Sequence, residues 1–239
     1  ISNALTGSLY VGSYNNEDYG DANIKTLNVG GSIRANGYYS PEIEAERINS
    51  LIVGGDVEAR IDAFSYRTIR IGGDLRGGED WGSGSIDGET AKSIRIGGSI
   101  IGGNGEESGS IDIDNVGSIF VGGSIQGGSG WGSGRIEVDD EVSRVTIIGS
   151  VIGGAGELSG TVLGEDQIGT IRIDGDVIAG SGFVSGVVGG VYAYTYYQGY
   201  YDFYFEGNVE KIVIRGSVIG TDGGEFAGSI IASRGESLR

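Results

Sequence analysis

Carboxylates recur at one position of a sequence repeat, where they could bind a divalent cation. Asp87, Asp112 and Glu137 lie 25 residues apart, each directly after an isoleucine. A second row of acids follows two residues later and consists of Glu89, Asp114, Asp139 and Glu165. Calcium prefers clusters of oxygen ligands. We therefore expect that calcium could bind here, with ligands from the set Asp87, Asp112, Asp114, Glu137 and Asp139.

A second interpretation of the same acids is a solvated surface ladder. The chain lacks the strict Gly-Gly-x-Gly-x-Asp nonapeptide of calcium-binding β-rolls. Like charges directly opposite each other on neighbouring strands are destabilising. Solvent, together with Arg70, Arg95 and Arg172, would then screen the carboxylates. The sequence leaves both interpretations open.

Catalysis is a third use of paired carboxylates, since such pairs hydrolyse glycosides, and parallel β-helices include polysaccharide-cleaving enzymes. A repeated row of acids is more typical of surface charge than of a single active site. The chain also contains no His and no Cys, so the commonest acid–base side chain is missing. We expect no enzyme, no catalytic residue and no cofactor other than calcium.

Aromatic and acidic residues alternate in a second column, in the Gly-rich segments of successive repeats. The column contains Trp81, Glu106, Trp131, Glu157, Phe183 and Glu225. Stacked repeats would place its aromatic rings about 9.6 Å apart, which is twice the strand spacing. Trp81 and Trp131 could then contact the apolar faces of sugar rings. The alternative is that each ring lies on the neighbouring Gly-rich loop.

A Tyr-rich insertion forms a third unusual segment, between Val191 and Glu206. Gln198-Gly199 is a plausible two-residue turn between two strands, so we expect a β-hairpin. An isolated hairpin is marginal in water. This one should pack on its own coils, on the next subunit or on a ligand. The residues expected in a subunit contact are Tyr192, Tyr194, Tyr196, Tyr200 and Phe203.

A repeat of about 25 residues must position all of these side chains. Its pattern is apolar-x-apolar-Gly-Gly-(Ser/Asp)-apolar, then a Gly-rich stretch, then Ser-Gly-x-apolar. It predicts an all-β, right-handed parallel β-solenoid of about nine coils with three short strands per coil. The Gly pairs should supply backbone angles for the corners, and the Ser/Asp after them should bond nearby backbone groups. One solenoid domain should span residues 1–239, with insertions at 11–23 and 189–208 that leave one edge.

The alignment of successive repeats predicts three ladders of stacked core residues. The first contains Ile71, Ile96, Val121, Ile147, Ile173 and Ile214. The second contains Leu75, Ile100, Ile125, Val151, Val177 and Val218. The third contains Ile86, Ile111, Ile136, Val162, Val188 and Ile230.

Composition limits the partners. Fifty glycines with a single proline exclude an ordinary globular domain and collagen. The formal net charge is −17. A polyanion of this kind repels nucleic acid and anionic membranes, so we expect neither partner, and no segment is apolar enough to insert into a bilayer.

The two ends of the chain complete one repeat when they are joined. Ser237-Leu238-Arg239 followed by Ile1-Ser2-Asn3-Ala4-Leu5 is in phase with Ser93 to Ile100. Bare solenoid ends invite pairing with another chain, and a head-to-tail contact that does not close generates a filament. We expect a homopolymer with Ile1, Leu5, Leu238 and Arg239 at the subunit interface. The alternative is a slice of a longer solenoid.

The repeat resembles Gly-rich bacterial surface β-strand-repeat proteins, the parallel β-helix type of large secreted, adhesin-like polypeptides. The matching motifs are Ile69-Arg70-Ile71-Gly72-Gly73-Asp74-Leu75, Ser118-Ile119-Phe120-Val121-Gly122-Gly123-Ser124-Ile125 and Ser108-Gly109-Ser110-Ile111. The resemblance implies an extracellular or cell-surface location and a structural or adhesive role. We therefore expect a structural subunit of an extracellular filament. The alternative is a stalk segment of a secreted adhesin that binds polysaccharide or a cell surface, and a polysaccharide-active enzyme is the least favoured.

Overall fold

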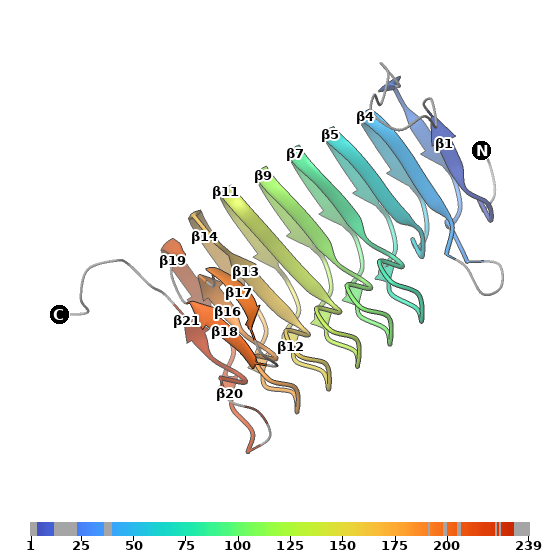
Figure 1. The fold of residues 1–239 in the computed structure, drawn as a ribbon. Coiled ribbons are helices and arrows are strands. Elements are labelled where there is room, and N and C mark those ends of the chain that lie inside the picture. The colour runs from blue at the N-terminus through green and yellow to red at the C-terminus, as the bar shows by residue number, and fades with distance from the viewer. Residues whose placement is uncertain are drawn as a thin grey trace.

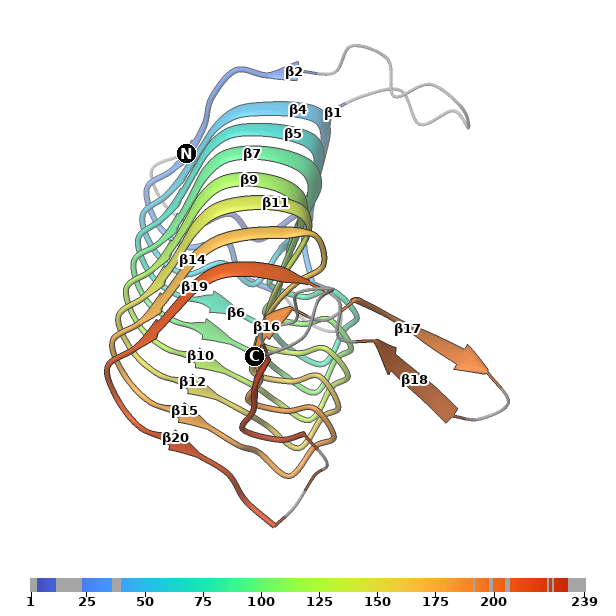
Figure 2. The same cartoon turned by 90° about the vertical axis from the view of Figure 1, so that its left-hand side faces the viewer.

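The chain coils into a stack of parallel strands (Figures 1 and 2). A computed structural model describes residues 4–11, 23–35, 40–190, 192–197, 200–204, 207–222, 224 and 226–231, and of residues 11, 192–197 and 200–204 only the backbone. These residues form strands and no helix, and hence none that could span a membrane. The structure confirms an all-β parallel β-solenoid.

One long strand and one short strand alternate along the regular coils. The long strands are β4 (Glu42–Val53), β5 (Arg60–Ile71), β7 (Ile86–Ile96), β9 (Ile111–Val121) and β11 (Arg135–Ile147). The short strands are β6 (Leu75–Arg76), β8 (Ile100–Ile101), β10 (Ile125–Gln126), β12 (Val151–Ile152), β15 (Val177–Ile178) and β20 (Val218–Ile219). The long strands pair with one another in the large sheet, and the short strands pair with one another in a separate six-stranded sheet.

Shorter strands complete the large sheet at both ends of the stack. These are β1 (Leu9–Val11), β2 (Asn23–Ile24), β3 (Leu27–Val29), β13 (Thr161–Gly164), β14 (Gln167–Ile173), β16 (Val188–Gly190), β19 (Asn208–Ile214) and β21 (Ile230–Ile231). The Tyr-rich insertion forms the expected hairpin, in which β17 (Tyr192–Tyr197) pairs antiparallel with β18 (Tyr200–Tyr204). The hairpin extends away from the coils (Figure 2).

The predicted strand count differs from the observed one for a simple reason. The third strand of one coil and the first strand of the next run on without a break as one long strand that bends (Figure 2). The strand continues even where it contains a glycine, as β7 does at Gly88. We call the part before the bend the first limb and the part after it the second limb. The first limbs are residues 42–46, 60–64, 86–89, 111–114 and 135–140, and the second limbs are residues 47–53, 65–71, 90–96, 115–121 and 141–147.

All three predicted core ladders are confirmed by the strand register. Ile71 pairs with Ile96, Leu75 with Ile100, and Ile86 with Ile111, and each ladder continues through the predicted residues. The first ladder begins at Val29 and reaches Ile214 in seven turns. The nine predicted coils included a level with Leu238, which lies outside the described residues.

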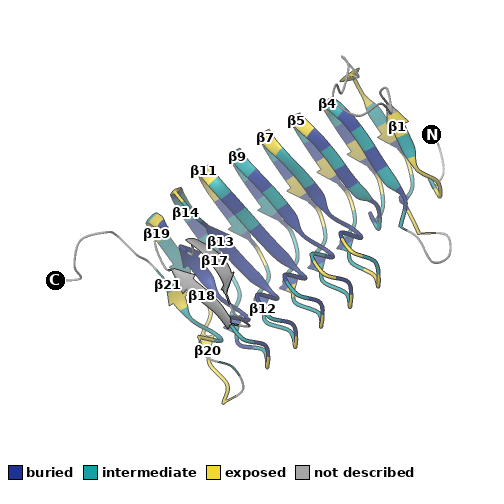
Figure 3. Ribbon diagram, viewed as in Figure 1, coloured by how far each residue is buried: buried dark blue, intermediate teal, exposed yellow. Residues whose placement is uncertain are grey.

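The buried residues line the interior of the coil (Figure 3). Among the described residues this core is aliphatic except for Tyr66. Side chains on the first limbs largely alternate between the interior and solvent, as the period of two requires. On the second limbs two outward residues separate two buried ones, as Arg67 and Thr68 separate Tyr66 from Ile69. Ile69, Ile71, Ile94 and Ile96 are at most 2% exposed. β-Branched residues suit this environment because they pack well on a pleated surface. Each coil buries its apolar face only against its neighbours.

The corner after the Gly pair is held by a ladder of hydrogen bonds between coils. The backbone N–H of Ser99 donates to Asp74 Oδ1, the N–H of Ser124 to Ser99 Oγ, and the N–H of Ser150 to Ser124 Oγ. The same bond recurs from Ser32 to Ser217. The predicted role of this Ser/Asp position is therefore confirmed, and the bonded backbone group belongs to the next coil.

The Gly pairs are required by close contact between coils. A Cβ on Gly97 would lie 2.4 Å from the carbonyl oxygen of Gly72 in the coil before, and Gly122 repeats this relation to Gly97. Neither residue has a positive φ, so the expected reason, special backbone angles, is wrong at these positions.

Left-handed backbone occurs instead in the Gly-rich loops. Gly82 and Gly132 have positive φ, and the equivalent residues of other coils are Glu107, Leu158, Val184 and Phe226, with φ between 52° and 59°. A β-branched residue resists this conformation. Val184 and Leu158 are at most 1% exposed. The stacked neighbours therefore impose the loop conformation on residues that do not favour it.

Candidate functional site

The predicted acidic ladder is formed on the first limbs. Asp62 pairs in register with Asp87, Asp87 with Asp112, and Asp112 with Glu137. Glu44 extends the row because it pairs with Asp62. Neighbouring carboxylates on one face of parallel strands are separated by one strand spacing, about 4.8 Å. At this spacing like charges repel unless cations or protons compensate them.

Arg60 supplies one cation near the start of this ladder. Its Nη2 lies 2.6 Å from Asp62 Oδ2, and its Nε lies 3.5 Å from Asp87 Oδ2. The guanidinium also lies under Trp81, with Cζ 4.8 Å from the ring centroid. The coil of Arg60 lacks the Gly-rich loop, since only two residues separate Val57 from β5. The Trp81 ring therefore rests on Arg60 rather than on a loop.

Arg135 is the second cation, and it is buried. The residue is 1% exposed, and its Nη1 lies 2.5 Å from Glu137 Oε2. Its Nη2 lies 3.4 Å from Asp112 and 3.6 Å from Glu107, and Cζ is 5.2 Å from the Trp131 ring centroid. A buried charge of this kind requires close partners. Three carboxylates and one ring provide them.

Sequence reasoning missed these two arginines. Arg60 and Arg135 stand at the same position of the repeat, directly before the first core residue of the first limb, and that shared phase was the available signal. The expected screening by Arg70, Arg95 and Arg172 is wrong. Arg70 and Arg95 lie on the second limb, and Arg172 pairs with Asp174 at 2.7 Å.

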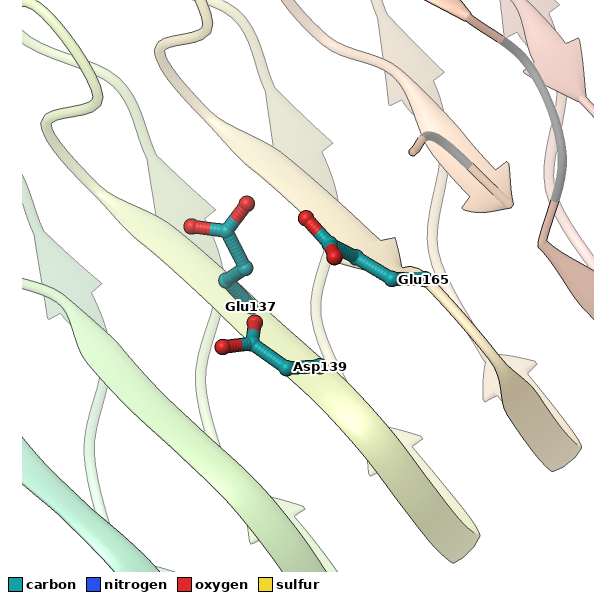
Figure 4. A group of neighbouring side chains, drawn as sticks. All are labelled: Glu137, Asp139 and Glu165. Carbon is teal, nitrogen blue, oxygen red and sulfur yellow. The ribbon is translucent and has the colours of Figure 1, made fainter. Parts of the chain in front are cut away.

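Acids of both rows gather at one end of the ladder. Glu137, Asp139 and Glu165 each place a carboxylate oxygen within 4.8 Å of those of the other two (Figure 4). Glu137 and Asp139 belong to the expected calcium set. Glu165 joins them because it follows Gly164, which pairs in register with Val138. The remaining expected ligands lie elsewhere: Asp87 at Arg60, Asp112 at Arg135, and Asp114 on β9.

Protons provide further compensation for the ladder. Burial raises the pKa of Asp87 to about 7, although the Ser85 hydroxyl, 2.7 Å away, and Arg60 oppose the shift. Burial also raises the pKa of Glu137 to about 7 against the pull of Arg135. For Asp139, burial and then the charges of Asp112 and Glu165 raise the pKa to about 7. The ladder therefore changes its charge near neutral pH.

The aromatic column is also formed as predicted in the described residues. Backbone bonds join consecutive loops: the N–H of Gly82 donates to Glu106 O, that of Glu107 to Trp131 O, and that of Gly132 to Glu157 O. Trp81 is 55% exposed, whereas Trp131 is half-buried. Glu225 lies outside the described residues. Trp81 is therefore the ring that offers an open face to a ligand, and a sugar contact at either ring stays a prediction.

The predicted subunit contacts are only partly visible. Leu5 is half-buried and pairs with Ile33 as the first residue of the second core ladder. Ile1, Leu238 and Arg239 lie outside the described residues. For Tyr192, Tyr194, Tyr196, Tyr200 and Phe203 the structure gives the backbone of β17 and β18 without side chains.

No family is identified by similarity. The chain matches no protein-family model, no curated protein and no solved structure.

The last described level of the stack is apolar and open. Val218 is 49% and Ile230 37% exposed, whereas Val177 and Val188, their equivalents one coil earlier, are 0% exposed. Ile219 and Phe226 add exposed fractions of 44% and 48%. Among the described residues, no further coil covers this level as each earlier level is covered by the next.

Charge is divided between the two limbs of the long strands. The first limbs carry eleven acids and only two cations, Arg60 and Arg135. The second limbs carry the opposite excess; their cations are Arg47, Arg67, Arg70, Lys92, Arg95 and Arg144, with Glu141 as the acid. We call the second limbs of β5, β7 and β9, residues 65–71, 90–96 and 115–121, the basic panel. It contains four cations and no acid.

Proposed function

We propose that this protein is a structural subunit of an extracellular filament that assembles head to tail by stacking its last coil on the first coil of the next copy. The observation that carries the proposal is the open apolar level at Val218 and Ile230. It agrees with the resemblance to Gly-rich surface β-strand-repeat proteins. The calcium and sugar contacts described above would be additions to this structural role.

The two ends of the core ladders match in chemistry. The second ladder begins at Leu5 and ends at Val218, and the third begins at Leu9 and ends at Ile230. Leu5 and Leu9 already pack against the core from one side. Continuing the stack would set Leu5 of the next copy on Val218 and its Leu9 on Ile230. Burial of these apolar surfaces favours association by about 25 cal/mol per Å².

The backbone of the last corner continues the same pattern. In a parallel ladder, alternate residues bond to opposite neighbours. The N–H of Val177 donates to Ser217 O and that of Ala179 to Ile219 O, so the N–H and C=O of Val218 face the open side. By the rule of the earlier coils, Val218 would donate to Ala4 O of the next copy. Ser217 Oγ would accept from the N–H of that Ala4.

Substitution at both ends of the ladder tests this contact. Val218→Asp and Leu5→Asp should each prevent filament formation, because an unpaired carboxylate would be buried at the junction. Ile148→Asp is the matched control, since Ile148 is 43% exposed on a coil in the middle of the stack. Negative-stain electron microscopy and sedimentation velocity would measure assembly, and circular dichroism would measure strand content. Normal filaments from both terminal variants would contradict the proposal.

A stalk segment of a longer adhesin is the second candidate function. The exposed Trp81 favours it, because one ring face is held by Arg60 and the other is open to a sugar. In that case the open levels would be covered by further coils of the same polypeptide, and the purified chain would form discrete rods. Loss of glycan-array binding in Trp81→Ala would support the stalk, and unchanged binding would count against it.

A further inference from the structure

The basic panel concentrates cations on a protein of strongly negative charge. Arg67, Arg70, Lys92 and Arg95 are all exposed and lie on the neighbouring strands β5 and β7. The formal net charge of the chain is −17. A local positive surface is therefore surrounded by a negative field, and it attracts anions only where they touch it.

No carboxylate of the described residues compensates these cations in an ion pair. Arg70 pairs in register with Arg95, and like charges directly opposite each other are destabilising. The ion pairs among the described residues involve none of the four. Arg95 instead lies over the Phe120 ring, with Cζ 3.9 Å from its centroid. Fold stability does not explain a row of repelling cations, whereas an anionic ligand along the row would.

The rest of the panel has the chemistry of a sugar-binding surface. Hydroxyl and amide side chains lie in register on either side of the cations: Ser65 with Thr90 and Asn115, and Thr68 with Ser93 and Ser118. These groups both donate and accept hydrogen bonds, as sugar hydroxyls do. Arginine binds a carboxylate through paired, charge-assisted hydrogen bonds. We infer that the basic panel binds a linear acidic polysaccharide that carries carboxylates.

The geometry favours a polymer that runs along the axis of the solenoid. Equivalent side chains repeat about every 4.8 Å in that direction, so one extended chain can meet the cations of β5 and β7 in turn. A second copy of this protein fits less well, because its net charge is the same. Four of its first-limb acids, Asp62, Asp87, Asp112 and Glu137, are also already paired with Arg60 or Arg135. Nucleic acid carries a denser charge than a polymer with one acid per sugar, so the surrounding field opposes it more strongly.

The inference is independent of filament assembly, and paired substitutions test it. Arg70→Gln/Arg95→Gln removes two charges from the panel, and Arg34→Gln/Arg76→Gln removes two from the short-strand side of the coil. Binding of the full chain to polygalacturonate, neutral dextran and single-stranded DNA would be measured by biolayer interferometry at low and high salt. Melting curves would confirm that both variants are folded.

We expect salt-sensitive binding to polygalacturonate, no binding to dextran, and at least about a tenfold loss of affinity in Arg70→Gln/Arg95→Gln only. Absence of binding by the unaltered chain, or an equal loss in Arg34→Gln/Arg76→Gln, would overturn the inference. Tighter binding of DNA than of polygalacturonate would assign the panel to nucleic acid instead. A change in self-association of Arg70→Gln/Arg95→Gln without polymer would assign it to a second copy.

Discussion

Arg60 and Arg135 occupy the same position of the coil, three coils apart, and each binds the acid two residues after it. Arg60 Nη2 lies 2.6 Å from Asp62, and Arg135 Nη1 lies 2.5 Å from Glu137. The two coils between them carry Ser85 and Ser110 at this position. The acidic ladder is therefore compensated by a cation at each of two coils and by protons, since burial raises the pKa of Asp87, Glu137 and Asp139.

Removal of Arg135 should destabilise the stack strongly. Arg135→Met would leave Glu107, Asp112 and Glu137 without their shared cation, and breaking a buried ion pair costs about 3–5 kcal/mol. Urea unfolding at pH 8 would measure the loss. Arg144→Met, at an exposed site on the second limb of the same strand, is the matched control and should change little. Equal stability of the two variants would show that solvent, not Arg135, compensates these acids.

Stability should fall as the pH rises from about 4 to 7. Asp87, Glu137 and Asp139 have pKa values raised to about 7 in the fold by burial, so the folded chain holds protons that the unfolded chain has released. The unfolding free energy decreases with pH wherever the folded state binds more protons. The stabilising effect is complete below the ordinary carboxylate pKa, near 4, and is lost through pH 7.

Urea midpoints measured between pH 4 and pH 8 would check this dependence. Asp139→Asn should flatten the curve because one of the three titrating groups is gone, whereas Asp140→Asn, on the exposed neighbour, should not. Asp174 has a lowered pKa because Arg172 donates a hydrogen bond to it. Its contribution to stability has the opposite pH dependence, and it changes only below about pH 4. Stability that rises steadily from pH 4 to 8 would refute the proposed protonation of the ladder.

Calcium should raise the melting temperature above neutral pH if the cluster of Glu137, Asp139 and Glu165 binds it. Glu137, Asp139 and Glu165 can each supply one oxygen, and calcium takes six to eight in all. Differential scanning calorimetry at pH 8, with calcium or with a chelator, would measure the shift. Asp139→Asn should abolish it, and Asp140→Asn should retain it. An unchanged melting temperature in the unaltered chain would mean that the row is only solvated.

Loss of a corner hydroxyl should cost more than loss of a surface hydroxyl. Ser99 Oγ accepts the backbone N–H of Ser124 at 3.1 Å, so Ser99→Ala leaves that N–H without its acceptor. An unsatisfied buried donor costs about 1–3 kcal/mol. Ser93→Ala, on the second limb of β7, is the control and should fall within about 0.5 kcal/mol of the unaltered chain. Chemical denaturation of both variants would decide whether the corner ladder stabilises the stack.

The core ladders could be predicted from the sequence because their signal is local and periodic. Ile71, Ile96 and Val121 each precede a Gly pair, so a single phase places all of them on one ladder. The partners of the acids could not be found in this way. Arg60 reaches Trp81 only because its coil lacks a loop, and Arg135 reaches Glu107 across coils. These contacts depend on differences between consecutive coils. The repeat pattern that all coils share carries no information about such differences.

The left-handed conformation of Val184 shows that a coil cannot take its shape alone. A φ of 52° is unfavourable for valine. The loops stacked beside Val184 hold it in this conformation. A new coil must therefore copy a coil that is already formed, so the stack grows by templating from a nucleus. If subunits join end to end, the growing tip offers the same template to the incoming chain, and elongation becomes a continuation of folding.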